Sequence, residues 1–125
     1  MTKLSLAFFS AAVLCVLCGM SWGIVMASSD NYTMMPAHAH LNLVGWASLA
    51  LMGTFYQLSG KAGRLGWINF VLSFGAVIVL TPSLALYLGG NKAAEMGTAV
   101  GSVLALLGML TFAASVFSTW KTARA

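Results

Sequence analysis

The sequence predicts an all-α membrane protein with four transmembrane helices. Hydrophobic residues make up 60% of the 125 residues, charged residues only 6%, and the mean hydropathy is +0.92. A soluble domain of this length cannot bury so much apolar surface. The apolar residues also fall into four runs, each long enough to supply the roughly 20 residues that a helix needs to cross a bilayer.

The runs and the short segments between them define one domain, residues 1–125. The expected helices cover about 4–27, 36–58, 67–88 and 93–120. For the first run the competing interpretation is a signal peptide, because Val25-Met-Ala27 resembles a cleavage site, but the run is long for one and we expect a retained helix. In the second helix Pro36 suits the first turn, and Thr33 is the expected N-cap.

The third and fourth helices carry features typical of membrane spans. Pro82 removes one backbone hydrogen bond from the third helix, which is tolerated where neighbouring helices satisfy the freed carbonyl. Gly97 and Gly101, with Gly108 two turns on, form a small-xxx-small pattern that favours helix contact within or between protomers. Glu95 falls in the first turn of the fourth helix, where a negative charge complements the helix dipole.

The basic residues predict that both termini face the cytoplasm. In that orientation the outside holds Lys92 and both acidic residues, Asp30 and Glu95, whereas the cytoplasmic side holds the other five of the six basic residues. These five are Lys3, Lys61, Arg64, Lys121 and Arg124. The net charge of +4 therefore reflects orientation in the membrane, and we expect no nucleic-acid partner. In a bacterium the chain would lie in the inner (cytoplasmic) membrane.

Both histidines of the chain, His38 and His40, lie just inside the outer end of the second helix, near the periplasmic side. Ionisable side chains at that depth are costly and usually mark a pathway or a cofactor. Each residue turns an α-helix by about 100°, so positions two apart face nearly opposite directions. One metal ion chelated by both rings is therefore disfavoured, and two separate sites are easier to build.

The surroundings of the histidines favour haem over a hydrated ion. Small residues keep the helix thin and leave room for a flat group; they are Ala37, Ala39, Gly45, Ala47 and Ser48. Zinc or copper would require three or four ligands, and the sequence has no further histidine and no carboxylate at that depth. Imidazole is a common axial ligand of haem iron. The alternative without a cofactor is a structural histidine pair that is hydrogen-bonded to neighbouring helices or to water.

Other residues near the histidines are candidates for secondary roles. Asn42, one turn below His38, could fix a histidine tautomer or brace the helices, and Trp46 could pack on a cofactor ring. Cys15 and Cys18 share a helical face and are most simply two small apolar side chains. Because Gly19 rather than a histidine follows them, they are not a covalent c-type attachment site, and the expected cofactor is non-covalent haem b.

Residues 37–56, Ala-His-Ala-His-Leu-Asn-Leu-Val-Gly-Trp-Ala-Ser-Leu-Ala-Leu-Met-Gly-Thr-Phe-Tyr, resemble the tenth helix of subunit I of the haem-copper oxidases and the related nitric oxide reductases. That helix carries an Ala-His-x-His segment followed by small residues and Met-Gly. In the family the second histidine, matching His40, ligates the low-spin haem, and the first, matching His38, ligates the haem of the oxygen-reducing centre. The family's second helix supplies the other low-spin ligand from the place of His38.

The resemblance implies a homotrimer. Subunit I of the family resembles three arcs of four helices in pseudo-threefold arrangement, so three copies of this chain would rebuild the twelve-helix plan by true symmetry. We therefore expect His38 of one protomer and His40 of its neighbour to clamp one haem, with three equivalent haems per trimer.

The departures from the family limit the chemistry. The copper-site histidines and the arginine pair that holds the haem propionates are absent from the sequence. The outer-face residues that could replace the arginines are Lys92, Asn91, Asn31 and Tyr32. Six-coordinate iron without copper has no open position for oxygen, so we do not expect this chain alone to reduce oxygen.

The expected function is electron transfer or redox buffering at the outer face, with an electron donor or acceptor that the sequence does not identify. One alternative is a haem-based gas or redox sensor, or a small reductase, in which one histidine dissociates. The other is a non-enzymatic accessory or assembly subunit of a respiratory complex, with structural histidines.

Overall fold

The computed structural model describes residues 1–61 and 63–123, and these residues form helices joined by short connections. In chain order the helices are α1 (Lys3–Ser29), α2 (Met35–His40), η1 (Leu41–Ser48), α3 (Leu49–Ser59), α4 (Arg64–Leu88), η2 (Lys92–Ala94), α5 (Glu95–Thr119) and η3 (Trp120–Thr122). Segments η2 and η3 are single 3₁₀ turns, and η1 is a π-helix. The predicted all-helical fold is confirmed for these residues.

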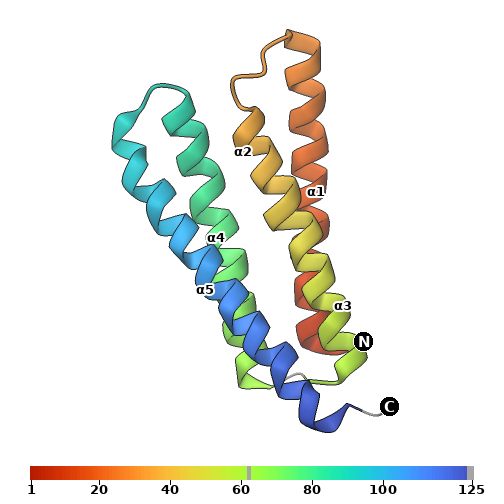
Figure 1. Cartoon of the computed structure of the whole chain (residues 1–125). Helices are drawn as coiled ribbons and strands as arrows, with labels where there is room; N and C mark the ends of the chain where they lie inside the picture. The colour runs from red at the N-terminus through yellow and green to blue at the C-terminus, as the bar shows by residue number, and fades with distance from the viewer. Residues whose placement is uncertain (62, 124–125) are drawn as a thin grey trace.

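The helices form a pair of antiparallel hairpins, one made of α1 with α2, η1 and α3, the other of α4 with α5 (Figure 1). Both chain termini lie at the same end of the molecule, which we call the terminal end. The α1–α2 and α4–α5 connections lie at the opposite end, which we call the loop end. The hairpins contact each other toward both ends, because α2 lies against α4 toward the loop end and α3 meets α4 and α5 toward the terminal end.

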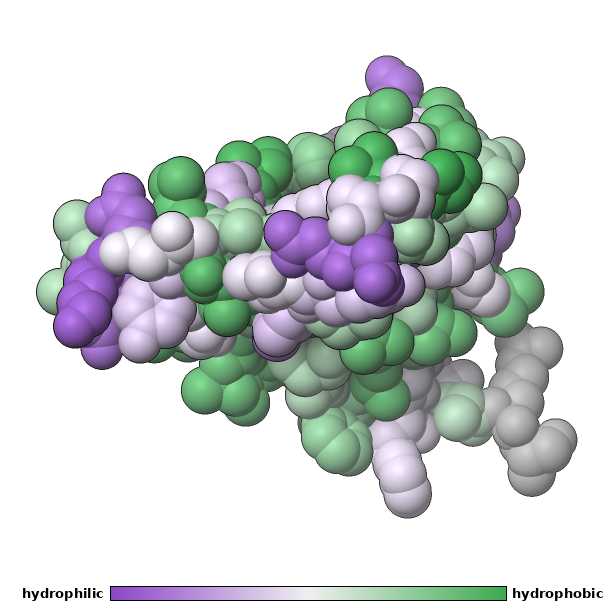
Figure 2. Space-filling view, turned by 90° about the horizontal axis from the view of Figure 1, so that it is seen from above, coloured by the Kyte–Doolittle hydropathy of each residue, from purple (hydrophilic) through white to green (hydrophobic). Residues whose placement is uncertain are grey.

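Within the described residues, three helical stretches are long and apolar enough to cross a membrane: Lys3–Ser29, Arg64–Leu88 and Lys92–Thr119. They correspond to the first, third and fourth predicted helices. Large apolar side chains such as Leu17, Val71 and Leu106 are exposed along them. Figure 2, which looks down on the loop end, shows hydrophobic residues around much of the sides and hydrophilic residues over part of the end. Such a surface belongs in lipid.

The second predicted helix, 36–58, corresponds to α2, η1 and α3, which follow one another without a gap from Met35 to Ser59. The regular α-helical geometry expected there is wrong over Leu41–Ser48, where the helix widens to a π-helix. Ser48 supports the wide turn, because its hydroxyl donates to the carbonyl of Leu43, five residues back, at 2.8 Å.

The spacing of buried residues accounts for the π segment. Every fourth residue along this stretch is buried: Ala37, Leu41, Gly45, Leu49 and Gly53. In an α-helix of about 3.6 residues per turn, positions four apart drift steadily around the axis. A π turn closes its hydrogen bond one residue later and so holds more residues per turn. The widened segment therefore keeps the series on one face, against the neighbouring helices.

The start of α2 differs in detail from the prediction. Pro36 lies in the first turn, as expected, but the N-cap residue is Met34 and has no side-chain capping bond. Thr33 instead donates its hydroxyl hydrogen to Asn31 Oδ1 at 2.7 Å. The prediction that Thr33 caps the helix was wrong because this side chain completes a turn within the preceding loop.

Glycines set the close approach of neighbouring helices. A β-carbon at Gly53 would lie 2.9 Å from Phe8 Cβ on α1, and one at Gly101 would lie 2.6 Å from the Leu80 Cα on α4. Gly97 and Gly108 likewise contact α4, through Ser83 and Ser73 respectively. The small-xxx-small pattern of the fourth predicted helix thus makes helix contact within the protomer.

A buried polar network joins α3, α4 and α5 in the half of the molecule near the terminal end. Asn69 donates from Nδ2 to the Tyr56 hydroxyl at 3.0 Å, and that hydroxyl donates to Ser115 Oγ at 2.9 Å. Ser73 donates to Asn69 Oδ1 at 2.8 Å. Since Tyr56 and Asn69 are almost completely buried, these bonds fix how the hairpins meet.

Replacing Tyr56 by phenylalanine is expected to lower the free energy of unfolding by about 1–3 kcal/mol, because the buried Asn69 amide loses its acceptor. Thermal unfolding of the detergent-solubilised protein measures the effect. Tyr87→Phe is the matched control, since that side chain is 42% exposed and should tolerate the change. Equal midpoints for the two variants would contradict the role of the network.

Candidate functional site

The two histidines lie in α2 near the loop end, directly before the π segment, and their side chains occupy different environments. His38 is half-buried, and its ring lies against α1, whereas His40 is exposed. The rings therefore lie on different sides of α2, one facing the inside of the hairpin and one facing out of the protomer.

The His38 ring packs into a gap on α1 that a glycine provides. A β-carbon at Gly23 would lie 3.1 Å from His38 Cε1, tighter than most such contacts. The neighbouring Trp22 meets the imidazole edge to face, with ring centroids 6.5 Å apart and an interplanar angle of 88°. Packing against Gly23 and Trp22, and not a strong hydrogen bond, limits the directions in which the His38 ring can point.

Asn42 lies one turn after His38 and also faces α1. Its Nδ2 donates to the backbone carbonyl of His38 at 2.9 Å and approaches each ring nitrogen at 3.4 Å, a long distance for a hydrogen bond. Its amide oxygen would be 2.5 Å from a β-carbon at Gly19. The amide thus braces the helix pair and lies beside the imidazole.

His40 has a defined tautomer. Its Nδ1 lies 2.7 Å from the carbonyl oxygen of Pro36. A carbonyl oxygen only accepts, so Nδ1 carries the proton, and in the neutral ring Nε2 holds the free lone pair. A histidine that donates from one nitrogen to a carbonyl and ligates through the other is the usual arrangement at metal centres. This bond leaves Nε2 of the exposed His40 ring as the nitrogen that could bind a metal.

The small residues beside the histidines have two different roles. Ala37 and Gly45 are buried, and a β-carbon at Gly45 would lie 2.9 Å from Cys15 Sγ and 3.3 Å from Val77. The interpretation that these two leave room for a flat group is wrong inside the protomer, because α1 and α4 fill the space. Ala39, Ala47 and Ser48 are only half-buried, and Trp46 is 37% exposed.

Lys92, a predicted contact of the cofactor, is exposed in η2 between α4 and α5. This turn and the α1–α2 loop lie at the same end of the molecule (Figure 1). A pocket of about 350 Å³ opens at this end, next to the Trp22 that contacts His38; its lining includes Asn31, Met34 and Gly89. Polar groups of a cofactor edge would meet Asn31 there.

Within residues 1–61 and 63–123, no group of three or more His, Cys, Asp or Glu side chains is placed to hold a metal ion. Cys15 and Cys18 are free thiols, the first buried against Gly45 and the second exposed. Zinc and copper sites need three or four such ligands, whereas haem iron needs only one or two imidazoles because the porphyrin supplies the others. The donor set fits haem.

Sequence reasoning missed the contacts that α1 makes with the histidine segment, because they join residues far apart in the chain. The spacing in the sequence could have indicated these contacts. Gly19 and Gly23 are four residues apart on α1, as are His38 and Asn42 on the next helix. Gly23 meets His38 and Gly19 meets Asn42.

Comparison of the chain with protein-family models, with curated proteins and with solved structures finds no match. The resemblance of residues 37–56 to the haem-copper oxidases therefore stays a prediction from the sequence.

Proposed function

We propose that this chain is a haem b-binding membrane protein in which His38 and His40 are axial ligands of non-covalently held haem. The observation that carries the proposal is the bond from His40 Nδ1 to the Pro36 carbonyl, which leaves Nε2 as the ligating nitrogen on an exposed face. The wide π segment that follows is a further support, since π turns occur frequently at functional sites.

The chain in this proposal crosses the membrane four times, with both termini in the cytoplasm of a bacterial cell. Gly23 meets His38 toward the loop end and Gly53 meets Phe8 toward the terminal end, so the α2–α3 stretch runs beside α1 over most of its length. Where α1 crosses the membrane, this stretch crosses with it. The excess of basic residues near the terminal end favours the cytoplasm for that end and the periplasmic side for the histidines.

In this proposal one haem is shared between neighbouring protomers of a homotrimer. A haem held by both histidines would need the two rings to reach a common centre. The His38 ring faces α1 of its own chain, whereas His40 faces outward, so the two rings of one chain do not meet over a common centre. For His38 of one protomer and His40 of its neighbour to hold one haem in a closed, symmetric assembly, the His38 ring would turn out of its contacts with Gly23 and Trp22.

The activity that this arrangement serves is electron transfer or redox buffering at the outer face. Haem iron supplies reversible one-electron chemistry when bound. The protein's own contribution is orientation: Trp22 and Asn42 lie beside the His38 ring, and the Pro36 carbonyl holds the His40 ring with Nδ1 as the donor. All proposed ligands lie at one depth, so electrons would move within the membrane plane rather than across it.

The test is the reduced-minus-oxidised optical spectrum of the purified protein, with its haem content and native mass. We expect a low-spin bis-histidine b-type spectrum, one haem per chain and a trimeric mass. A high-spin ferrous form that binds CO readily would favour a gas sensor instead. Colourless protein would favour an accessory or assembly subunit. A monomer that retains one low-spin haem would contradict the proposal that neighbouring protomers share each haem.

A further inference from the structure

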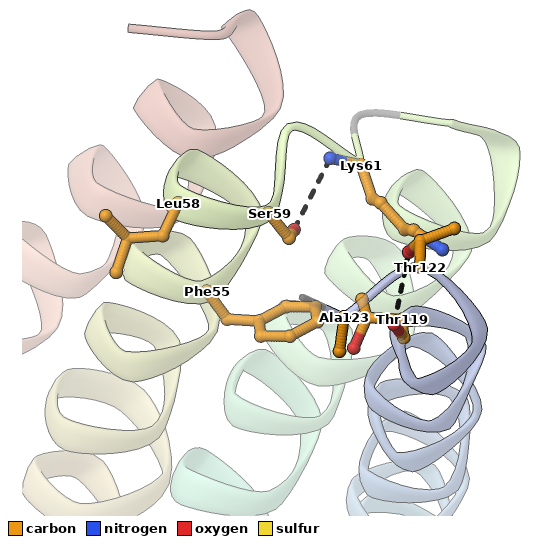
Figure 3. Close-up of a pocket in the computed structure, with 7 residues that line it drawn as sticks. All are labelled: Phe55, Leu58, Ser59, Lys61, Thr119, Thr122 and Ala123. Atoms are coloured by element: carbon orange, nitrogen blue, oxygen red, sulfur yellow. Dashed lines mark hydrogen bonds between the residues drawn. The ribbon is translucent and has the colours of Figure 1, made fainter. Parts of the chain in front are cut away.

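A second pocket, unrelated to the histidines, lies at the terminal end, where the last turns of α3 and α5 meet η3 (Figure 3). Its volume is about 380 Å³. The lining residues are Phe55, Leu58, Ser59, Lys61, Thr119, Thr122 and Ala123. One cationic side chain, three hydroxyls and two large apolar side chains thus surround the same space.

Lys61 is held in place by the end of α5. Its Nζ donates to the Ser118 carbonyl at 2.8 Å and to Ser118 Oγ at 3.2 Å. An ammonium group has three N–H donors, so one remains for a ligand after these two bonds. A lysine near a helix C-terminus also caps the last carbonyls, but capping alone does not explain the pocket beside it.

The charges near this pocket favour an anionic ligand. The two acidic residues of the sequence are Asp30, at the end of α1, and Glu95, in the first turn of α5, and both lie near the loop end. Five of the six basic residues belong, by their positions in the sequence, near the terminal end. Anionic lipid headgroups are the usual partners of such basic groups at a membrane surface.

The hydroxyls of the pocket select for a headgroup that donates hydrogen bonds. Thr119 Oγ1 donates to the Val116 carbonyl at 2.6 Å, and Thr122 Oγ1 donates to the Thr119 carbonyl at 3.1 Å. With their hydrogens used, these oxygens can only accept. Phe55 and Leu58, the latter 82% exposed, form an apolar side to the same pocket and suit an acyl chain.

We propose that this pocket binds an anionic glycerophospholipid whose headgroup carries free hydroxyls, as phosphatidylglycerol does. The phosphate lies beside Lys61 Nζ, the headgroup hydroxyls donate to Thr119 and Thr122, and the acyl chain lies along Phe55 and Leu58.

Native mass spectrometry of the detergent-purified full chain, titrated with defined lipids, tests the proposal. We expect phosphatidylglycerol to bind at one molecule per chain and roughly tenfold more tightly than phosphatidylcholine, the scale of one hydrogen bond to a charged group. Lys61→Gln should remove this preference. Lys3→Gln, the same substitution of an exposed lysine outside the pocket, should leave it unchanged.

Equal binding of the two lipids, or an unchanged preference in Lys61→Gln, would overturn the proposal. If inorganic phosphate competes with the lipid, the pocket is a site for a free anion. The proposal that its ligand is a lipid would then be wrong. Should Lys61→Gln yield no protein, Thr122→Val decides the matter. A loss of preference for phosphatidylglycerol over phosphatidic acid in this variant supports the proposal, and an unchanged preference overturns it.

Discussion

Replacing His40 by alanine is expected to abolish the bis-histidine spectrum at every site of the trimer. Each haem in the proposed assembly has one ligand from each of two chains, so the loss of His40 leaves every iron with His38 alone. His38→Ala should have the same effect for the same reason. The optical spectrum and the haem-to-protein ratio of each variant measure the result.

Added imidazole separates the two variants. His40 is exposed, so free imidazole should restore a low-spin spectrum in His40→Ala, whereas in His38→Ala the added imidazole would have to enter between the haem and α1, beside Trp22, and should restore it less. Leu51→Ala, an exposed position further along the same helical stretch, is the control and should keep the wild-type spectrum. If only one of the two histidine variants loses the low-spin signal, the proposal that neighbouring protomers share one haem through both histidines is wrong.

Gly101→Ala is expected to lower the free energy of unfolding by about 1–3 kcal/mol, the usual cost of forcing extra volume into a packed contact. A β-carbon at this position would lie 2.6 Å from the Leu80 Cα and 2.7 Å from its backbone nitrogen. Backbone atoms cannot rotate aside as a side chain does, so α4 and α5 must separate. Thermal unfolding in detergent measures the loss.

Gly75→Ala in α4 is the matched control, because a β-carbon there has no neighbour within 4 Å among the described residues. It should leave the unfolding midpoint unchanged or raise it, since alanine favours a helix over glycine by about 1 kcal/mol. A loss at Gly75 as large as that at Gly101 would mean that the two hairpin helices do not meet where the glycine contacts place them.

The positions of the helices could be predicted from the sequence because they follow from the length of the apolar runs. The contact made by Gly97 and Gly101 could be predicted for a similar reason, since small residues four apart form a flat helix face. The π segment could not be predicted, because a spacing of four residues between buried positions is also compatible with an ordinary α-helix. Thr33 was misassigned because a hydroxyl before a helix can complete a loop instead of a cap.

The placement of the two histidines was predictable from the sequence, but the contacts that surround them were not. That His38 and His40 lie on different sides of one helix follows from their spacing alone. The hydrogen bond that defines the His40 tautomer, and the glycines of α1 that receive His38 and Asn42, depend on the fold. Tyr56 and Asn69 likewise gave no local signal, because a polar residue in an apolar run has its partner on another helix.

The polar network around Tyr56 and Asn69 lies near the terminal end, whereas toward the loop end α2 lies against α4, with Met34 near Gly89. Separating the hairpins at the terminal end would leave the buried donors of Tyr56 and Asn69 without acceptors in a place without water, which is costly. Displacing α2 from α4 breaks no bond of this network. The end of the molecule that carries the imidazoles is therefore the easier of the two to displace.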